Sequence, residues 1–110
     1  MQFDNIKKLF VAIQLAFKKG KYRLTVHCLE RCIERSIEVE DIECVIEGGE
    51  IIEYYPEDKY GSSCLILGYT KKHRPLHIQC SINPVWIVTC YDPSEKKEKW
   101  SKDFRTRIKS

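Results

Sequence analysis

Apolar residues recur along the chain with two different periods, and the change of period falls near the pair Gly48-Gly49. Before this pair, apolar residues recur about every three to four positions, which is the spacing of one face of an α-helix. After it, apolar and polar residues tend to alternate, as in a β-strand with one buried face. The pattern predicts an α+β protein with helices in its first half and a sheet in its second.

Two of the predicted helices have clear ends. The first spans residues 4–19, where Asp4 is a suitable cap and Gly20 a suitable terminator. A shorter helix, at about 40–47, carries apolar residues on one side and ends at the glycine pair. The apolar face of the first helix must pack either on the core of this chain or on a partner.

A third predicted helix spans residues 26–35 and begins after the capping residue Thr25. The apolar residues predicted to face the core are Val26, Leu29 and Ile33, with Cys28 and Cys32 beside them. The run KYRLT before this helix predicts a short strand.

Charged side chains lie in rows on the rest of this helix. His27, Arg31 and Arg35 recur every four residues, which places them along one side. Glu34 and Glu38 follow the two arginines at three residues' distance and could pair with them on a solvated surface. A row of one imidazole and two guanidinium groups also suits a phosphate-bearing substrate. The sequence leaves both interpretations open.

The second half contains strand-like runs joined by short connections: EIIEYY, CLILGYT, PLHIQCSIN and VWIVTCY. Such connections require antiparallel neighbours, so the runs predict a four-stranded meander. For the last hairpin we prefer a three-residue loop, 83–85, over a two-residue loop. The apolar row then contains Leu76, Ile78, Cys80, Ile82, Trp86, Val88 and Cys90. The other row contains His77, Gln79, Ser81, Ile87, Thr89 and Tyr91.

Composition bounds the class of protein. The chain has 110 residues, of which 43% are hydrophobic and 32% charged, so residues 1–110 are expected to form one globular domain. This domain comprises the 4–19 helix, a core over 22–91 and a tail over 94–110. No apolar run approaches the roughly 20 residues of a membrane span, and the N-terminal apolar stretch lacks a signal-peptide cleavage pattern. We therefore expect a cytoplasmic protein with no membrane partner.

The six cysteines lie within apolar patterns, and no CxxC pair occurs. This arrangement favours buried free thiols in a reducing compartment over disulfides. The alternative is a zinc site that combines His27, Cys28 and Cys32 with a distant strand cysteine, but the ligand spacing of common zinc sites is missing. We expect no metal and no other cofactor.

The net charge of +3 is unevenly distributed. Glu38 to Asp58 contain nine acidic and no basic residues, whereas 94–110 contain seven basic and three acidic residues. A basic tail fits a nucleic-acid partner, although charged tails are also common without one. The tail is expected to be a short helix or a disordered arm, and Trp100 and Phe104 indicate that it docks. The candidate RNA-binding residues are Lys96, Lys97, Lys99, Lys102, Arg105 and Arg107.

The sequence contains no Walker loop, dinucleotide-binding glycine fingerprint, HExxH or GxSxG motif. It does contain the groups that metal-free RNA cleavage needs: a base for the 2′-OH proton, cations for the phosphate and an acid for the 5′ oxygen. The candidate catalytic residues are His27, Arg31, Arg35, His77 and Tyr91. Each has a structural alternative, namely ion pairing for the arginines, packing for His27 and Tyr91, and a solvated strand face for His77.

Residues 22–91 resemble a bacterial family described only as a domain of unknown function. The shared features are an H-x3-R-x3-R helix followed by isoleucine, an acidic second helix, the run GEII, an Asp-containing turn and PLHI on a strand. This family is similar to the RelE/BrnT/MqsR-like toxins of toxin–antitoxin systems. The resemblance implies a RelE-like core, in which two helices cover a small antiparallel sheet of four to five strands, here with an extra N-terminal helix.

The same resemblance implies a function. The family's motif residues fall on His27, Arg31, Arg35 and His77, and Tyr91 ends the last strand, where such toxins often place a functional side chain. Ser36 stands where the pattern often has glycine. The chain would be the toxin of a type II toxin–antitoxin system, a metal-independent mRNA endoribonuclease whose partners are RNA, ribosome-bound mRNA included, and a cognate antitoxin. In it a histidine would transfer protons, the arginines would hold phosphate and Tyr91 would position the base. The rival hypothesis is a non-catalytic RNA- or protein-binding module with the same fold.

Overall fold

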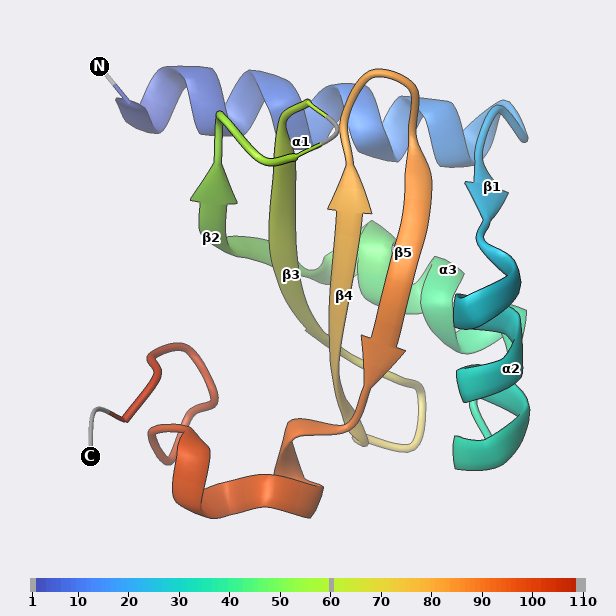
Figure 1. The fold of residues 1–110 in the computed structure, drawn as a ribbon, viewed down its shortest axis with the longest axis vertical. Coiled ribbons are helices and arrows are strands. Elements are labelled where there is room, and N and C mark those ends of the chain that lie inside the picture. The colour runs from blue at the N-terminus through green and yellow to red at the C-terminus, as the bar shows by residue number, and fades with distance from the viewer. Residues whose placement is uncertain (1, 60, 109–110) are drawn as a thin grey trace.

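The computed structural model describes residues 2–59 and 61–108, in which helices pack against a five-stranded sheet (Figure 1). The helices are α1 (Gln2–Lys18), α2 (Val26–Arg35), α3 (Val39–Gly48) and the 3-10 helix η1 (Pro93–Lys99). The strands are β1 (Arg23–Leu24), β2 (Glu50–Tyr55), β3 (Ser63–Tyr69), β4 (Pro75–Ser81) and β5 (Trp86–Tyr91). The α+β class with an N-terminal helix is confirmed. Because α1 begins at Gln2, position 4 lies inside the helix and not at its N-cap, so the predicted start of this helix is wrong by two residues.

The strands follow the order β1-β5-β4-β3-β2 across the sheet. The predicted meander is confirmed, since β2, β3, β4 and β5 each pair antiparallel with the next. β1 instead pairs in parallel with β5, through Arg23↔Trp86 and Leu24↔Ile87. The sheet is therefore mixed, and the prediction of an antiparallel sheet is wrong for β1. Two residues of strand contain no alternation from which a partner could be predicted.

α1 crosses the strands near one end of the sheet, and the C-terminal segment, residues 93–108, lies at the other end (Figure 1). α1 buries Ile13 and Phe17 in the hydrophobic core, so its apolar face packs on this chain. α3 lies very close to β3, because Gly68 lacks a side chain. A Cβ at that position would stand 2.7 Å from Cγ1 of Val45 and 2.9 Å from its carbonyl oxygen.

α2 turns a different face to the sheet than the pattern predicts. Three predicted core residues are instead 71%, 45% and 81% exposed: Val26, Leu29 and Ile33. The buried residues of α2 are Cys28 and Cys32, which belong to the core. In this orientation the Thr25 hydroxyl donates to the Val88 carbonyl at 3.1 Å and accepts from the Cys28 N–H at 3.0 Å. The buried face of α2 is therefore the one that contacts β5, and the local apolar pattern does not predict it.

The β4–β5 hairpin confirms the predicted register at one end, where His77 pairs with Tyr91. Further along, a bulge beside Cys80 shifts the pairing by one position. Ile87 therefore lies opposite Cys80 and is fully buried. Its predicted place in the polar row is wrong, because a bulge moves the residues beyond it to the other face.

The six cysteines are free, and all except the half-buried Cys44 are buried. Within residues 2–59 and 61–108, no three His, Cys, Asp or Glu side chains come together as a metal-binding group. The same part of the chain contains no helix with the length and apolar character needed to cross a membrane.

Candidate functional site

His77, on β4, lies in a buried cluster beneath the C-terminal segment. Its side chain is fully buried, whereas the sequence predicts a partly solvated polar row. The ring of Trp100, itself only 4% exposed, stands edge-on to the imidazole with 4.3 Å between ring centres. Tyr91 contacts the imidazole from the neighbouring strand, with 5.3 Å between ring centres. The prediction of a solvated His77 is wrong, because the chain after β5 folds back over it.

The hydrogen bonds of His77 determine which of its ring nitrogens carries the proton. Nε2 lies 2.8 Å from the carbonyl oxygen of Phe104, which can only accept, so Nε2–H is the donor. Burial lowers the pKa of His77 and keeps the ring neutral, which leaves Nδ1 as an acceptor. The Tyr91 hydroxyl, 3.1 Å away, therefore donates to Nδ1. Burial also raises the pKa of Tyr91, so this phenol keeps its proton at neutral pH.

Two ion pairs hold the C-terminal segment on the sheet. The guanidinium group of Arg107 contacts both carboxylate oxygens of Glu53, at 2.8 and 3.1 Å. The same group lies 4.7 Å from the centre of the Trp100 ring. Arg105 pairs with Glu50. The tail is thus docked, as Trp100 indicates, and two of its candidate RNA-binding cations are already engaged by β2.

Arg74 joins α2, β4 and the end of β5, although it is not among the site residues predicted from the sequence. Its guanidinium group donates to Asp92 at 2.9 Å, and to the carbonyl oxygens of Arg35 and Ser36 at 3.0 and 3.1 Å. Ser36 ends α2 with a φ of 54°, a left-handed conformation that favours glycine. The hairpin register brings positions 74 and 92 to the same end of the sheet, which is the signal that could have revealed this contact.

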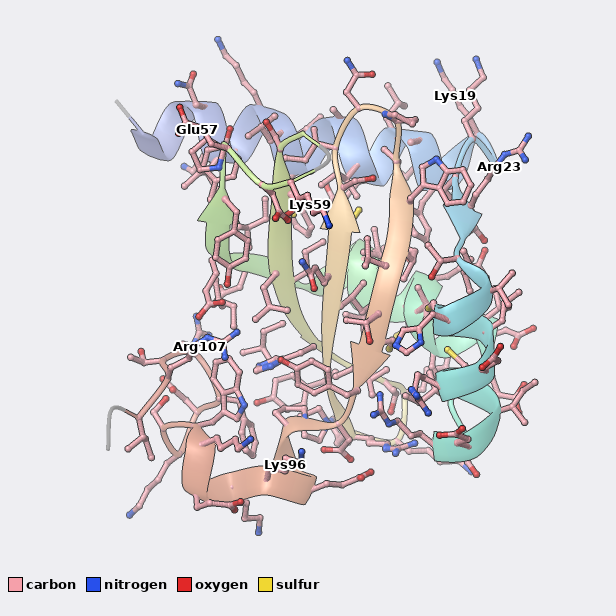
Figure 2. All side chains as sticks on the ribbon, in the orientation of Figure 1. Lys19, Arg23, Glu57, Lys59, Lys96 and Arg107 are labelled. Carbon is pink, nitrogen blue, oxygen red and sulfur yellow. The ribbon has the colours of Figure 1, made fainter. Side chains whose placement is uncertain are left out.

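A cavity of about 230 Å³ opens between the ends of α2 and β5 and the C-terminal segment. The cations lining it are Arg35, Lys96, Lys99 and Arg107, and Tyr91 lines it too. The acidic lining residues Asp92 and Glu95 both pair with Arg74. Within the described residues neither lysine has an ion-pair partner, so the cavity offers positive charge to an anion. Figure 2 shows Lys96 and Arg107 on the C-terminal segment beside this end of the sheet.

Arg35 connects this cavity to α2. Its Nη1 donates to the carbonyl oxygen of Cys90 at 2.9 Å, which holds the guanidinium group beside the end of β5. The other members of the helical row lie outside the cavity lining: His27 is exposed, and Arg31 pairs with Glu34 at 2.7 Å. Among the predicted catalytic residues, the structure brings together Arg35, His77 and Tyr91. Of the tail cations, Lys97 and Lys102 are exposed and do not line the cavity.

Fold and site thus define a small α+β protein with a cationic cavity at the end of its last strand. Residues 24–92, more than half of the chain, match the family model described as "Domain of unknown function (DUF4258)", and the chain belongs to this family. Arg35, His77 and Tyr91 lie within the matched range, whereas η1 and the returning tail lie beyond it. The comparison with curated proteins and the comparison with solved structures each gave no match.

Proposed function

We propose that this chain is an RNA-directed toxin of a type II toxin–antitoxin system, acting as a metal-independent mRNA endoribonuclease. The observation that carries the proposal is the cavity that is lined by Tyr91 together with the cations Arg35, Lys96 and Lys99. Guanidinium and ammonium groups bind phosphate, and a tyrosine hydroxyl can exchange a proton with the reacting oxygen. The resemblance to RelE/BrnT/MqsR-like toxins supports the same activity, a cytoplasmic location and a cognate antitoxin as partner.

In the proposed reaction the 2′ oxygen attacks the adjacent phosphorus, and the bond from phosphorus to the 5′ oxygen breaks. The 2′-OH proton passes to the Tyr91 oxygen while the Tyr91 proton passes to Nδ1 of His77. A lysine of the cavity donates a proton to the departing 5′ oxygen. Arg35 stabilises the charge that develops on the phosphate. His77 acts through Tyr91, which is why its neutral, acceptor form suits the reaction.

The non-catalytic binding module remains a second candidate because of one observation. Both ring nitrogens of His77 are engaged inside the protein, by Phe104 and Tyr91, and such closed contacts are also typical of a structural histidine. In that case the cavity would bind RNA phosphate without cleaving the chain.

Expression of the wild type and Tyr91→Phe in a bacterial host, with growth and total RNA followed together, tests the proposal. The phenylalanine variant retains the ring but has no proton to transfer. We expect the wild type to stop growth and fragment mRNA, and Tyr91→Phe to do neither at equal protein level. RNA binding without cleavage by the purified wild type would favour the binding module. Harmless expression of a wild type that also fails to bind RNA would refute both.

A further inference from the structure

A second cavity, of about 630 Å³, forms a groove along the open face of the sheet. Its lining extends from the turn after β2 to Arg107, and Figure 2 shows Glu57 and Arg107 at opposite ends of this face. Tyr91 and Arg107 line both this groove and the cationic cavity. The two spaces therefore adjoin the same pair of side chains, so one extended ligand could occupy both.

The charge of the groove differs from that of the cationic cavity. Its far end is lined by Glu57 and Asp58. A hydrogen bond from the Ser63 hydroxyl, at 2.5 Å, lowers the pKa of Asp58 and keeps it ionised. At the near end, the Arg107 charge is engaged by Glu53. Among the described residues, the only cation in this lining is already paired, so the lining offers no free positive charge to a phosphate, and the groove suits the uncharged part of a nucleotide.

The floor of the groove contains Leu65 and Gln79, which pair directly across β3 and β4. Leu65 is only 3% exposed and closes the groove from below, and Tyr55 adds an aromatic ring to the wall. The Gln79 amide forms no hydrogen bond with any described residue, so it can both donate and accept. An aromatic ring and an unpaired amide are features with which proteins bind an unstacked base.

We propose that this groove is a nucleobase subsite for single-stranded RNA, in which Gln79 favours bases with an exocyclic amino group over uracil. The subsite rests on the proposed function, because it places the phosphate of the same nucleotide in the cationic cavity. The Gln79 carbonyl oxygen accepts from the amino group of adenine, cytosine or guanine. The Gln79 amide could also turn and donate to a uracil carbonyl. Glu57 and Asp58, when ionised, can only accept hydrogen bonds, so they repel the uracil carbonyls and attract an amino group. The groove therefore favours a base with an amino group over uracil.

The proposal is tested by binding of short single-stranded RNAs that carry 2′-O-methyl groups and so cannot be cleaved. The probes are equal-length oligomers of A, of C, of U and of abasic ribose phosphate, measured by fluorescence anisotropy with the full chain. We expect the wild type to bind the A and C oligomers about tenfold more tightly than the U and abasic oligomers, the effect of a hydrogen bond of ordinary strength. In Gln79→Leu, which preserves the size of the side chain, this preference should fall to less than about twofold.

Two further variants make the outcome specific. Thr89→Val is the matched control, since Thr89 pairs with Gln79 across the hairpin but does not line the groove, and it should retain the full preference. If Gln79→Leu unfolds, Gln79→Asn retains the amide but withdraws it by one methylene, and the preference should again fall. A wild type that binds base-bearing and abasic oligomers equally, or a Gln79 variant that retains the preference, overturns the subsite and leaves the proposed function standing. Failure to bind every oligomer, the abasic one included, overturns both.

Discussion

The exposed surface of α2 and the end of the sheet beneath the C-terminal segment carry the same kinds of side chain in different surroundings. Arg31 and Arg35 are one helical turn apart, yet Arg31 pairs with Glu34 of its own helix while Arg35 bonds to the carbonyl oxygen of Cys90. The two regions also hold one candidate histidine each. His27 is exposed on α2, whereas His77 is fully buried beneath the segment that follows β5.

This difference shows what separates a charged surface from a candidate site. On the exposed surface of α2, Arg31 pairs with its sequence neighbour Glu34, and an exposed pair of this kind contributes only about 0–1 kcal/mol. At the end of the sheet, residues from α2, β4, β5 and the C-terminal segment fix one another's positions. Residue spacing within one helix therefore identifies candidate site residues. Contacts between distant segments then show which of these residues lie together in a site.

The largest expected effect comes from removing the side chain that covers this end of the sheet. Trp100→Ala deletes a ring that is 4% exposed, stands over His77 and lies beneath Arg107. We expect the free energy of unfolding to fall by about 3–5 kcal/mol, as for other buried aromatic residues. Urea unfolding followed by circular dichroism measures this change. A loss below about 1 kcal/mol would mean that the segment is not part of the cooperative structure.

The second prediction compares the two arginines directly. Arg35→Ala should lower the rate of RNA cleavage about a hundredfold, because it removes a contact to developing charge worth roughly 3 kcal/mol. Arg31→Ala is the matched control and should change the rate less than about threefold, since it loses only an exposed ion pair. The measurements are single-turnover cleavage rates, with thermal melts to confirm that both variants fold. Equal rates for the two variants would contradict the assignment of Arg35 to the phosphate.

The elements themselves were predictable from the sequence, because periodicity and capping are local. Residues 26–35 form a helix as predicted, since Thr25 caps it and the chain turns at Ser36. The face that this helix buries was not predictable, because it depends on contacts with β5, among them the hydrogen bond from the Thr25 hydroxyl to Val88, 63 residues later in the chain. The residues that this helix buries are Cys28 and Cys32. The apolar pattern instead predicts Val26, Leu29 and Ile33 as its core residues.

The candidate site was predictable in part, for a similar reason. The hairpin register pairs His77 with Tyr91, and it follows from short loops and alternation. The cover over His77 does not follow from any pattern, because it depends on the path of the chain after η1. That path brings the backbone carbonyl of Phe104, a group present in every residue type, to the imidazole. Sequence patterns describe side chains and contain no signal for such a contact.

The third prediction tests the burial of His77 through pH. In the folded chain burial lowers the pKa of His77 below the usual 6.5, and in the unfolded chain this cause is absent. The unfolded state therefore binds a proton more readily. The stability that comes from the neutral ring is fully present above pH 6.5, and it is lost as the pH falls toward the pKa of the folded state. The melting temperature of the wild type should fall across this window.

Two glutamine variants separate His77 from other sources of acid sensitivity. His77→Gln cannot gain a proton, and its amide can still donate to the Phe104 carbonyl, so the fall in melting temperature below pH 6.5 should largely disappear. His27→Gln, which removes the exposed histidine of α2, should retain the wild-type fall. The charged groups acting on His77 include Glu53, Arg107 and Asp92, and of these the Asp92 carboxyl has a lowered pKa, so it titrates well below this window. Identical profiles for both variants would mean that the ring is accessible to solvent.

The smallest effect is expected on the exposed side of α2. Ile33 is 81% exposed, so Ile33→Gln removes almost no buried surface and replaces a β-branched residue with a better helix former. We expect the free energy of unfolding to change by less than about 0.5 kcal/mol, measured by urea unfolding at low protein concentration. Ile42→Gln is the matched control in α3, because Ile42 is fully buried and the same substitution there places an amide in the core. A large loss in Ile33→Gln would show that this side of α2 is covered in solution, and it would remove the difference between the two regions.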